Sequence, residues 1–219
     1  DKIPQTIAEA RQMQNADEWE TACMKKLESM KTLQVYSLTT LPEGRTAIQA
    51  KWVFDRKSSG IAKARLVAKG YSQRAGVDYH QTFAPTARFE SVRLLLSMAA
   101  EKKWKILQLD VSTAFLNADL KEEIYLCQPE GFKDSKNPHL VWRLHKAIYG
   151  LKQAPREWNL RISSFFQSID FSQMKSDNSI FVKRIEGELA VILLYVDDLL
   201  IFGTCQNLLL ELKKQLCAE

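Results

Sequence analysis

Two adjacent aspartates interrupt an apolar stretch near the end of the chain. Asp197 and Asp198 lie inside the run Leu189–Phe202, whose other residues are all apolar or aromatic. A strand that breaks at two carboxylates and then resumes is typical of a tight β-hairpin with both acids at its tip. Asp110 ends a second apolar strand, Trp104–Leu109. Burying adjacent acids without a counter-charge is costly, so we expect these carboxylates to meet solvent, a basic group or a metal ion.

The three acids together could support phosphoryl transfer. If the two strands are neighbours in one sheet, their carboxylates converge, and oxygen ligands of this kind hold hard divalent cations such as Mg²⁺. Two such ions roughly 3.5–4 Å apart can activate an attacking hydroxyl and stabilise the departing phosphate oxygen. The alternative is a turn without a function, because aspartate is a common turn residue.

Basic residues are concentrated in one segment of the chain. The net charge is +5, but the segment 51–74 alone carries +6, which leaves −1 for the remainder. The segment contains one acid, Asp55, and seven basic residues: Lys51, Arg56, Lys57, Lys63, Arg65, Lys69 and Arg74. Such a segment suits phosphate chains or triphosphates. The alternative is a solvated basic surface.

The elements that must position these residues can be predicted from periodicity and turn signals. Expected helices cover about 7–30, 91–103, a segment beginning near Pro155, and 206–217. Expected strands cover 51–54, 64–69, 104–111, 125–128, 181–183 and 188–195, with a hairpin turn at Glu186-Gly187. This order predicts an α+β fold in which a small antiparallel sheet is backed by helices.

Composition limits the class of protein. With 219 residues and 46% apolar content, the chain is long enough for one large globular domain or two lobes. No apolar run reaches the length of a membrane span, and the first residues lack the apolar core of a secretory signal. The four cysteines have no metal-type spacing and only three histidines are present, which argues against structural zinc. We therefore expect buried thiols in a reducing compartment.

Several motifs occur together, in one order and at one spacing. They are Lys51-Trp52-Val53-Phe54, Lys63-Ala64-Arg65-Leu66-Val67-Ala68-Lys69-Gly70, Asp78-Tyr79 with Thr82-Phe83-Ala84-Pro85, Leu109-Asp110-Val111 with Ala114-Phe115-Leu116-Asn117, Gln128-Pro129-Glu130-Gly131-Phe132, Tyr149-Gly150-Leu151-Lys152-Gln153-Ala154-Pro155-Arg156, and Tyr195-Val196-Asp197-Asp198. In these motifs the chain resembles the reverse transcriptase of copia-type LTR retrotransposons. The resemblance covers nearly the whole chain.

The resemblance implies a right-hand polymerase fold with fingers and palm subdomains. It assigns residues 1–50 to an N-terminal helix and lead-in, 51–90 to a fingers ribbon, 91–125 to the palm, 126–155 mainly to the fingers and 156–219 to the palm. It also implies an RNA-directed DNA polymerase that uses two Mg²⁺ ions, with Mn²⁺ as a substitute, to extend a primer 3′-hydroxyl. The substrates would be deoxynucleoside triphosphates and an RNA or DNA template with its primer.

Individual residues take roles from the same resemblance. Asp110, Asp197 and Asp198, with the backbone carbonyl of Val111, would hold the metal ions. Arg65, with Lys63 or Lys57, would meet the incoming triphosphate, although these cations could equally attract a phosphate backbone. Three further residues would approach the nucleotide sugar, the nucleotide and the primer terminus: Phe115, Gln153 and Tyr195, respectively. The alternatives are a core aromatic at Phe115 and a solvated loop amide at Gln153.

The sequence also departs from the family pattern. Ala118 and Asp170 occupy positions where the family usually has glycine, which predicts a loss of backbone freedom there. The chain ends where the family continues into a thumb and a ribonuclease H domain, and the protease and integrase regions of the parent polyprotein are also missing. An inactive, truncated relic that at most binds nucleic acid is therefore an alternative to a polymerase. A carboxylate-metal nuclease would need a further acid or histidine near the three aspartates. By resemblance the protein would be intracellular, in cytoplasmic particles and the nucleus.

Overall fold

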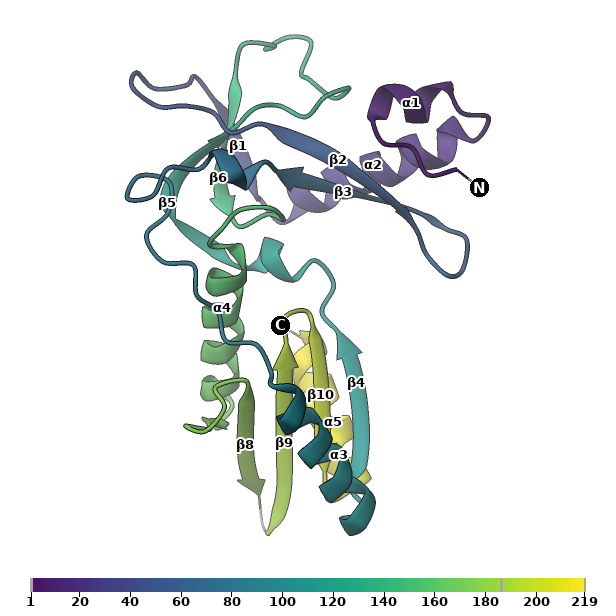
Figure 1. Ribbon diagram of the computed structural model, residues 1–219, viewed down its shortest axis with the longest axis vertical. Coiled ribbons are helices and arrows are strands. Elements are labelled where there is room, and N and C mark those ends of the chain that lie inside the picture. Colours follow the sequence, from purple (N-terminus) through teal and green to yellow (C-terminus); the bar gives the residue numbers. More distant parts are fainter. Residues whose placement is uncertain (1, 186, 219) are drawn as a thin grey trace. The chain divides into compact units, whose positions relative to one another are not determined.

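The computed structural model describes residues 2–185 and 187–218, and its contacts divide them into two compact units (Figure 1). The first unit comprises residues 2–83 and 115–158, and the second comprises 84–114 and 159–218. Both units mix helices with antiparallel sheet, as the predicted α+β class requires. The assignment of fingers and palm stays a prediction.

The first unit contains a two-stranded ribbon and a three-stranded sheet. Its elements are α1 (Ile7–Gln12), α2 (Ala16–Thr32), β1 (Tyr36–Thr39), β2 (Ala50–Arg56), β3 (Ala62–Ala68), a 3₁₀ turn η1 (Gly70–Ser72), β5 (Asp119–Leu126) and β6 (Val141–Lys146). Strands β2 and β3 form the predicted basic ribbon, and the order in the second sheet is β1-β6-β5. Helix α2 packs against β3, and its Trp19 also meets Phe54 of β2 edge-on, at 5.5 Å between ring centroids.

The N-terminal helix differs from its prediction. A single helix over 7–30 is wrong, because the chain leaves the helical conformation at Met13 and α2 begins after Asn15. Asparagine favours the position before a helix, and Asp17 and Glu18 in the first turn complement the helix dipole. Strands β1 and β6 were not predicted, although Tyr36–Thr39 and residues 142–145 alternate apolar and polar side chains as a half-buried strand does.

The second unit is a five-stranded antiparallel sheet between helices. Its strands, in spatial order, are β4 (Lys105–Asp110), β10 (Asp198–Gly203), β9 (Glu188–Tyr195), β8 (Ile180–Ile185) and β7 (Ser172–Gln173). Helix α3 (Phe89–Lys102) packs its Leu95 and Ala99 on one face. Helix α5 (Gln206–Ala218) contacts β10 and β4. In the second half of α4 (Ala154–Ser168), the ring centroid of Phe166 lies 4.9 Å from that of Phe181. A short 3₁₀ turn, η2 (Ala114–Asn117), lies where the chain passes from one unit to the other.

The start of α3 is fixed by an acid from a distant loop. This helix was predicted from residue 91, but it begins at Phe89, and Ser91 lies in its first turn. The buried Asp177 carboxylate accepts hydrogen bonds from the Ser91 hydroxyl at 2.6 Å and from the Arg88 amide at 3.4 Å. Burial alone would raise the pKa of Asp177, but these hydrogen bonds and one from the Ser179 amide lower it.

The two departures from the family pattern have different consequences. Asp170 has a φ of +67°, the left-handed region that glycine prefers, and aspartate is one of the few other residues that tolerate it. Ala118 does not have a positive φ, and it is fully buried. Its amide donates to the Phe115 carbonyl and its carbonyl accepts from the Ala147 amide. The predicted loss of backbone freedom therefore applies to Asp170 and not to Ala118.

Other predictions have mixed outcomes. Cys23 is buried as expected, but Cys127 and Cys205 are only partly buried, and the side chain of Cys217 lies outside the described residues. The predicted hairpin at Glu186-Gly187 also involves a residue outside that range. Among the helices that the structure describes, none combines the length and the hydropathy needed to cross a membrane.

Candidate active site

The Asp-Asp pair lies at the tip of a two-residue hairpin in the second unit. Strand β9 ends at Tyr195, Val196 and Asp197 form the turn, and Asp198 opens β10 opposite Tyr195. On its other side β10 pairs with β4, and here Asp198 is the register partner of Asp110. The prediction that the two acid-bearing strands are neighbours in one sheet is confirmed.

The register brings two carboxylates into the closest kind of cross-strand pair. The Val111 amide donates to the Asp197 carbonyl at 2.8 Å, so these two residues occupy a hydrogen-bonded position of the ladder. Asp110 and Asp198, one step away, then form a non-hydrogen-bonded pair, in which the Cα atoms are about 4.5 Å apart. Like charges directly opposite one another destabilise a sheet. The fold therefore accepts an electrostatic cost at this position.

The backbone at the hairpin tip is also strained. Val196 has a φ of +54°, a conformation that is an outlier for a β-branched residue. Strain of this kind costs on the order of 1–3 kcal/mol and persists only where the surrounding structure enforces it. Here the ladders on both sides of β10 fix the turn and, with it, the position of Asp197.

The side chains at the tip are accessible. Asp110 and Tyr195 are exposed, whereas Asp197 and Asp198 are partly buried. The Gln108 amide lies two residues before Asp110 on the same face, and its Nε2 is 3.5 Å from Asp198 Oδ1. Within residues 2–185 and 187–218, no group of three or more acidic, histidine or cysteine side chains is close enough to hold a metal ion. The structure thus brings together a pair of acids with a third beside it, and their role as metal ligands stays a prediction.

In the first unit, several cations of the basic segment already have partners. Arg56 packs on Trp19 with its guanidinium carbon 5.0 Å from the ring centroid, and it also pairs with Glu18 at 2.9 Å. Arg65 bonds Asp55 at 3.2 Å, and this hydrogen bond is the main cause of the lowered pKa of Asp55. These contacts leave mainly lysines to act on a ligand, among them Lys63, which lies opposite Asp55 in the ribbon.

Tyr149 lies close to one of the predicted nucleotide residues and to a lysine that was not predicted. The Phe115 ring meets the Tyr149 ring edge-on at 4.7 Å, and Phe115 is only 7% exposed. Lys26 Nζ, from α2, lies 5.8 Å from the Tyr149 ring centroid. Phe115 therefore has the packing of a core aromatic in this structure, and its predicted contact with a sugar stays a prediction.

Gln153 belongs to a buried polar network. Its Oε1 accepts from Gln73 Nε2 at 2.9 Å and its Nε2 donates to the Asp78 carbonyl at 2.8 Å, while the side chain is 0% exposed. The alternative of a solvated loop amide is wrong, because the Gln153 side chain is buried and hydrogen-bonded to residues of the segment 73–78. The predicted contact of Gln153 with a nucleotide would require it to exchange these partners.

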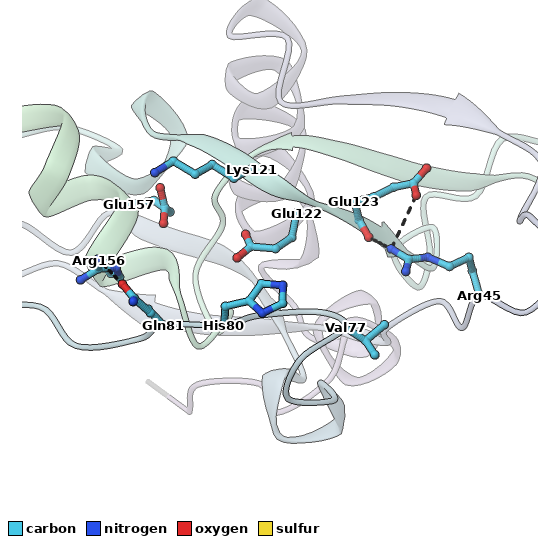
Figure 2. A pocket seen from close by; sticks show the side chains of 9 residues that line it. All are labelled: Arg45, Val77, His80, Gln81, Lys121, Glu122, Glu123, Arg156 and Glu157. Atoms are coloured by element: carbon cyan, nitrogen blue, oxygen red, sulfur yellow. Dashed lines mark hydrogen bonds and ion pairs between the residues drawn. The ribbon is translucent and has the colours of Figure 1, made fainter.

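A charged cavity of about 390 Å³ lies beside this network (Figure 2). Arg45 reaches Glu123, and Arg156 donates to the Phe83 carbonyl and to Gln81, so both guanidinium groups are already bound. Burial is the main cause of the raised pKa of Glu157, and Lys121 opposes this rise. Three basic and three acidic residues line the cavity, and His80, which had no predicted role, also lines it. The cavity is largely compensated by its own charges.

The predicted site residues thus fall into two groups. Asp110, Val111, Asp197, Asp198 and Tyr195 meet at one end of the sheet in the second unit. Lys63, Arg65, Phe115 and Gln153 belong to the first unit. Sequence reasoning missed Lys26, Tyr149 and Gln108. Lys26 could have been noticed, because its neighbours three and four positions away on the helix include no acid.

The fold and the acidic hairpin match a defined class of protein. The family model described as "Reverse transcriptase (RNA-dependent DNA polymerase)" matches residues 33–219. The chain belongs to this reverse transcriptase family, of the copia type.

Curated relatives are parts of transposon polyproteins. The chain is 40% identical, over 99% of its length, to the retrovirus-related Pol polyprotein from transposon TNT 1-94 of Nicotiana tabacum. It is 40% and 39% identical to those from transposons RE2 and RE1 of Arabidopsis thaliana, over 89% and 88% of its length. The chain spans 17%, 14% and 14% of these three proteins, respectively.

Proposed function

We propose that this chain is the polymerase module of a copia-type Pol polyprotein, with a right-hand fold, and that it extends a primer 3′-hydroxyl with deoxynucleoside triphosphates on an RNA or DNA template. The observation that carries the proposal is the cross-strand pair of Asp110 and Asp198 beside Asp197. Two like charges held face to face, at the accessible end of a sheet, are what a site for divalent cations requires.

The donor set at the hairpin fits Mg²⁺ or Mn²⁺. Asp110, Asp197 and Asp198 supply hard carboxylate oxygens, and the carbonyl of Val111, the residue after β4, would add a further oxygen ligand. When bound, two such ions activate a hydroxyl nucleophile and stabilise a departing phosphate oxygen. The chain's own part is to hold its carboxylates fixed, through the ladders on both sides of β10 and the strained turn at Val196.

Residues of the first unit would recognise the nucleotide. Lys63 and Arg65 supply positive charge for a triphosphate. Phe115 would exclude a ribose 2′-hydroxyl, and Gln153 would contact the nucleotide after leaving its present partners. Tyr195, exposed on the acidic hairpin, would approach the primer terminus.

Primer extension on an RNA template with Mg²⁺ or Mn²⁺ tests the proposal. We expect incorporation by the wild-type chain and a loss of at least about a hundredfold in Asp197→Asn, because a metal-binding site is worth several kcal/mol of barrier. Glu101→Gln, an exposed acid on α3, is the matched control and should retain full activity. Equal activity of Asp197→Asn and wild type would refute the assignment of the acids.

A second candidate is nucleic-acid binding without catalysis, and the charge of the segment 51–74 favours it. In that case no incorporation would occur under any metal condition. Binding to a template-primer would still weaken steeply with salt, because neutralised phosphates release counterions. Asp197→Asn would then bind as tightly as the wild type.

A further inference from the structure

The second unit contains a cavity that the proposed function does not use. It has a volume of about 700 Å³ and lies between helix α3, strands β7 to β9 and the loop that joins β7 to β8. All of its lining residues belong to the second unit. Protein interiors are close-packed and rarely contain voids much larger than a water molecule. The size of this cavity is instead in the range of ligand pockets, which measure about 300–1,000 Å³.

The cavity has an apolar wall because α3 covers the sheet incompletely. Ile180 and Val182 of β8 lie on the same face of the sheet, and Val191 of β9 is the register partner of Val182. On α3, Leu95 packs on this face and is 6% exposed, whereas Leu94 beside it lines the cavity and is 61% exposed. The helix therefore leaves part of an apolar surface open for a ligand to bury.

The buried acid of the cavity is already bonded within the protein. Asp177 is 7% exposed, and its carboxylate accepts from the Ser91 hydroxyl and from the amides of Arg88 and Ser179. These hydrogen bonds stabilise the charge of Asp177 without a ligand.

Two arginines bring positive charge to the same cavity. Arg88 and Arg184 both line it, and both are exposed. Within residues 2–185 and 187–218, neither guanidinium group has a hydrogen bond or an ion pair. Glu90 also lines the cavity and is exposed. Because Asp177 is already bonded, the charges that remain open to a ligand are two cations and one anion.

We propose that this cavity binds a small apolar acid, a molecule with an elongated apolar body and one carboxylate or sulfonate group. Leu94, Met98 and Trp104 would cover the body. Arg184 shares the sheet face of Val182, so it would pair with the acidic group, and Arg88 would add to the positive potential.

The volume of the cavity favours a small molecule over a docked protein segment. A helix with its side chains is about 10–12 Å wide, so even two of its turns exceed the space available. The proposal adds a binding function to the second unit, and it does not depend on polymerase activity.

A gap in the packing without a binding function makes different predictions. If the apolar wall alone attracts ligands, a neutral molecule should bind as tightly as an acid of the same length. If the arginines take part, the acid should bind more tightly, and this difference should vanish when they are replaced.

Displacement of the fluorescent apolar anion anilinonaphthalene sulfonate from the folded full chain tests the proposal. We expect the wild type to bind the probe, and octanoate to displace it at about tenfold lower concentration than octanol, the effect of one charge-assisted contact. Val182→Phe, which fills the cavity, should weaken binding of the probe and of both competitors while the circular dichroism spectrum stays unchanged.

Charge variants give a second readout. Arg184→Met should weaken octanoate binding about tenfold and leave octanol binding unchanged. Lys175→Met is the matched control, because Lys175 is exposed in the same loop but does not line the cavity, and it should change affinity less than about twofold. Glu90→Gln should act in the opposite direction and tighten octanoate binding, because it removes a negative charge beside the ligand.

Several results would overturn the inference. They are the absence of probe binding by the wild type, equal displacement by octanoate and octanol, equal losses in Arg184→Met and Lys175→Met, and unchanged binding by Val182→Phe. None of these measurements uses a template, a primer or a nucleotide, so a negative result here leaves the polymerase proposal standing.

Discussion

The two units position their groups of like charge by different means. In the second unit, Asp110 and Asp198 face each other across a ladder, at the accessible end of the sheet, and hydrogen-bonded strands on both sides fix them. In the first unit, Lys26 is carried by a helix that packs against β3, it is partly buried beside the Tyr149 ring, and burial and then repulsion from Lys63 and Arg65 lower its pKa. The acids are positioned by local backbone geometry, and the cations by tertiary contacts.

This difference decides how each group responds to change. Backbone register tolerates side-chain substitution well, because the ladder persists when a carboxylate becomes an amide. A cluster assembled by packing depends on every element that contributes to it, and here these are α2, β3 and the loop at Tyr149. We therefore expect backbone changes around the Tyr149 loop to be more damaging than comparable changes at the hairpin tip.

The largest expected effect is that of Gly150→Ala. Gly150 has a φ of +90°, and a Cβ there would lie 2.1 Å from the Ala68 carbonyl oxygen at the end of β3. The neighbouring Tyr149 carbonyl accepts from the Ala68 amide at 2.8 Å, so the loop cannot move away without losing this bond. We expect a destabilisation of about 3 kcal/mol or more, measured by urea unfolding.

Gly44→Ala, in a different loop, is the matched control for Gly150→Ala. Gly44 has a φ of +76°, but nothing lies within 4 Å of the position of its Cβ. Its replacement should cost only about 1 kcal/mol, which is the backbone term alone. Similar losses at the two glycines would show that the close packing of the Tyr149 loop on β3 does not stabilise the first unit.

The same contrast explains what could be predicted from sequence. The acidic hairpin and its pairing with the Asp110 strand follow from apolar runs that end in acids, and these runs are local signals. The surroundings of Gln153 and Lys26 are set by residues about 75 to 125 positions away, such as Asp78 and Tyr149, and no local pattern encodes such contacts. The break between α1 and α2 was missed because helical periodicity continues across it, although Asn15, a residue type that favours the N-cap position, precedes α2.

The next prediction concerns stability and the charge of Lys26. A lysine with a pKa of about 8 when folded and 10.5 when unfolded binds its proton less tightly in the folded chain. Its protonation therefore favours unfolding, so wild-type stability should rise as the pH increases from 8 to 10.5. At pH 7, Lys26→Met should be more stable than the wild type by about 1 kcal/mol, after allowance for solvent screening.

Urea unfolding at pH 7 and pH 10.5 measures this effect. The advantage of Lys26→Met should shrink toward the higher pH, while Lys25→Met, at the exposed neighbour on the same helix, should match the wild type at both. If Lys26→Met is less stable at pH 7, the lysine stem and its contact with Tyr149 outweigh the repulsion between charges.

The smallest expected effect tests the strain at the acidic hairpin. Replacing Val196 by alanine or by glycine removes both γ-methyl groups, and the two variants differ only by one Cβ, whose main effect here is on the backbone conformation. In an ordinary strand, glycine would be the less stable of the pair. At a φ of +54° the order should reverse, with Val196→Gly more stable than Val196→Ala by about 1 kcal/mol in urea unfolding. The more flexible glycine should hold Asp197 less firmly, so primer extension by Val196→Gly should be slower than by Val196→Ala. Stability and activity that rank the two variants in the same order would mean that the strained turn plays no part in positioning the acids.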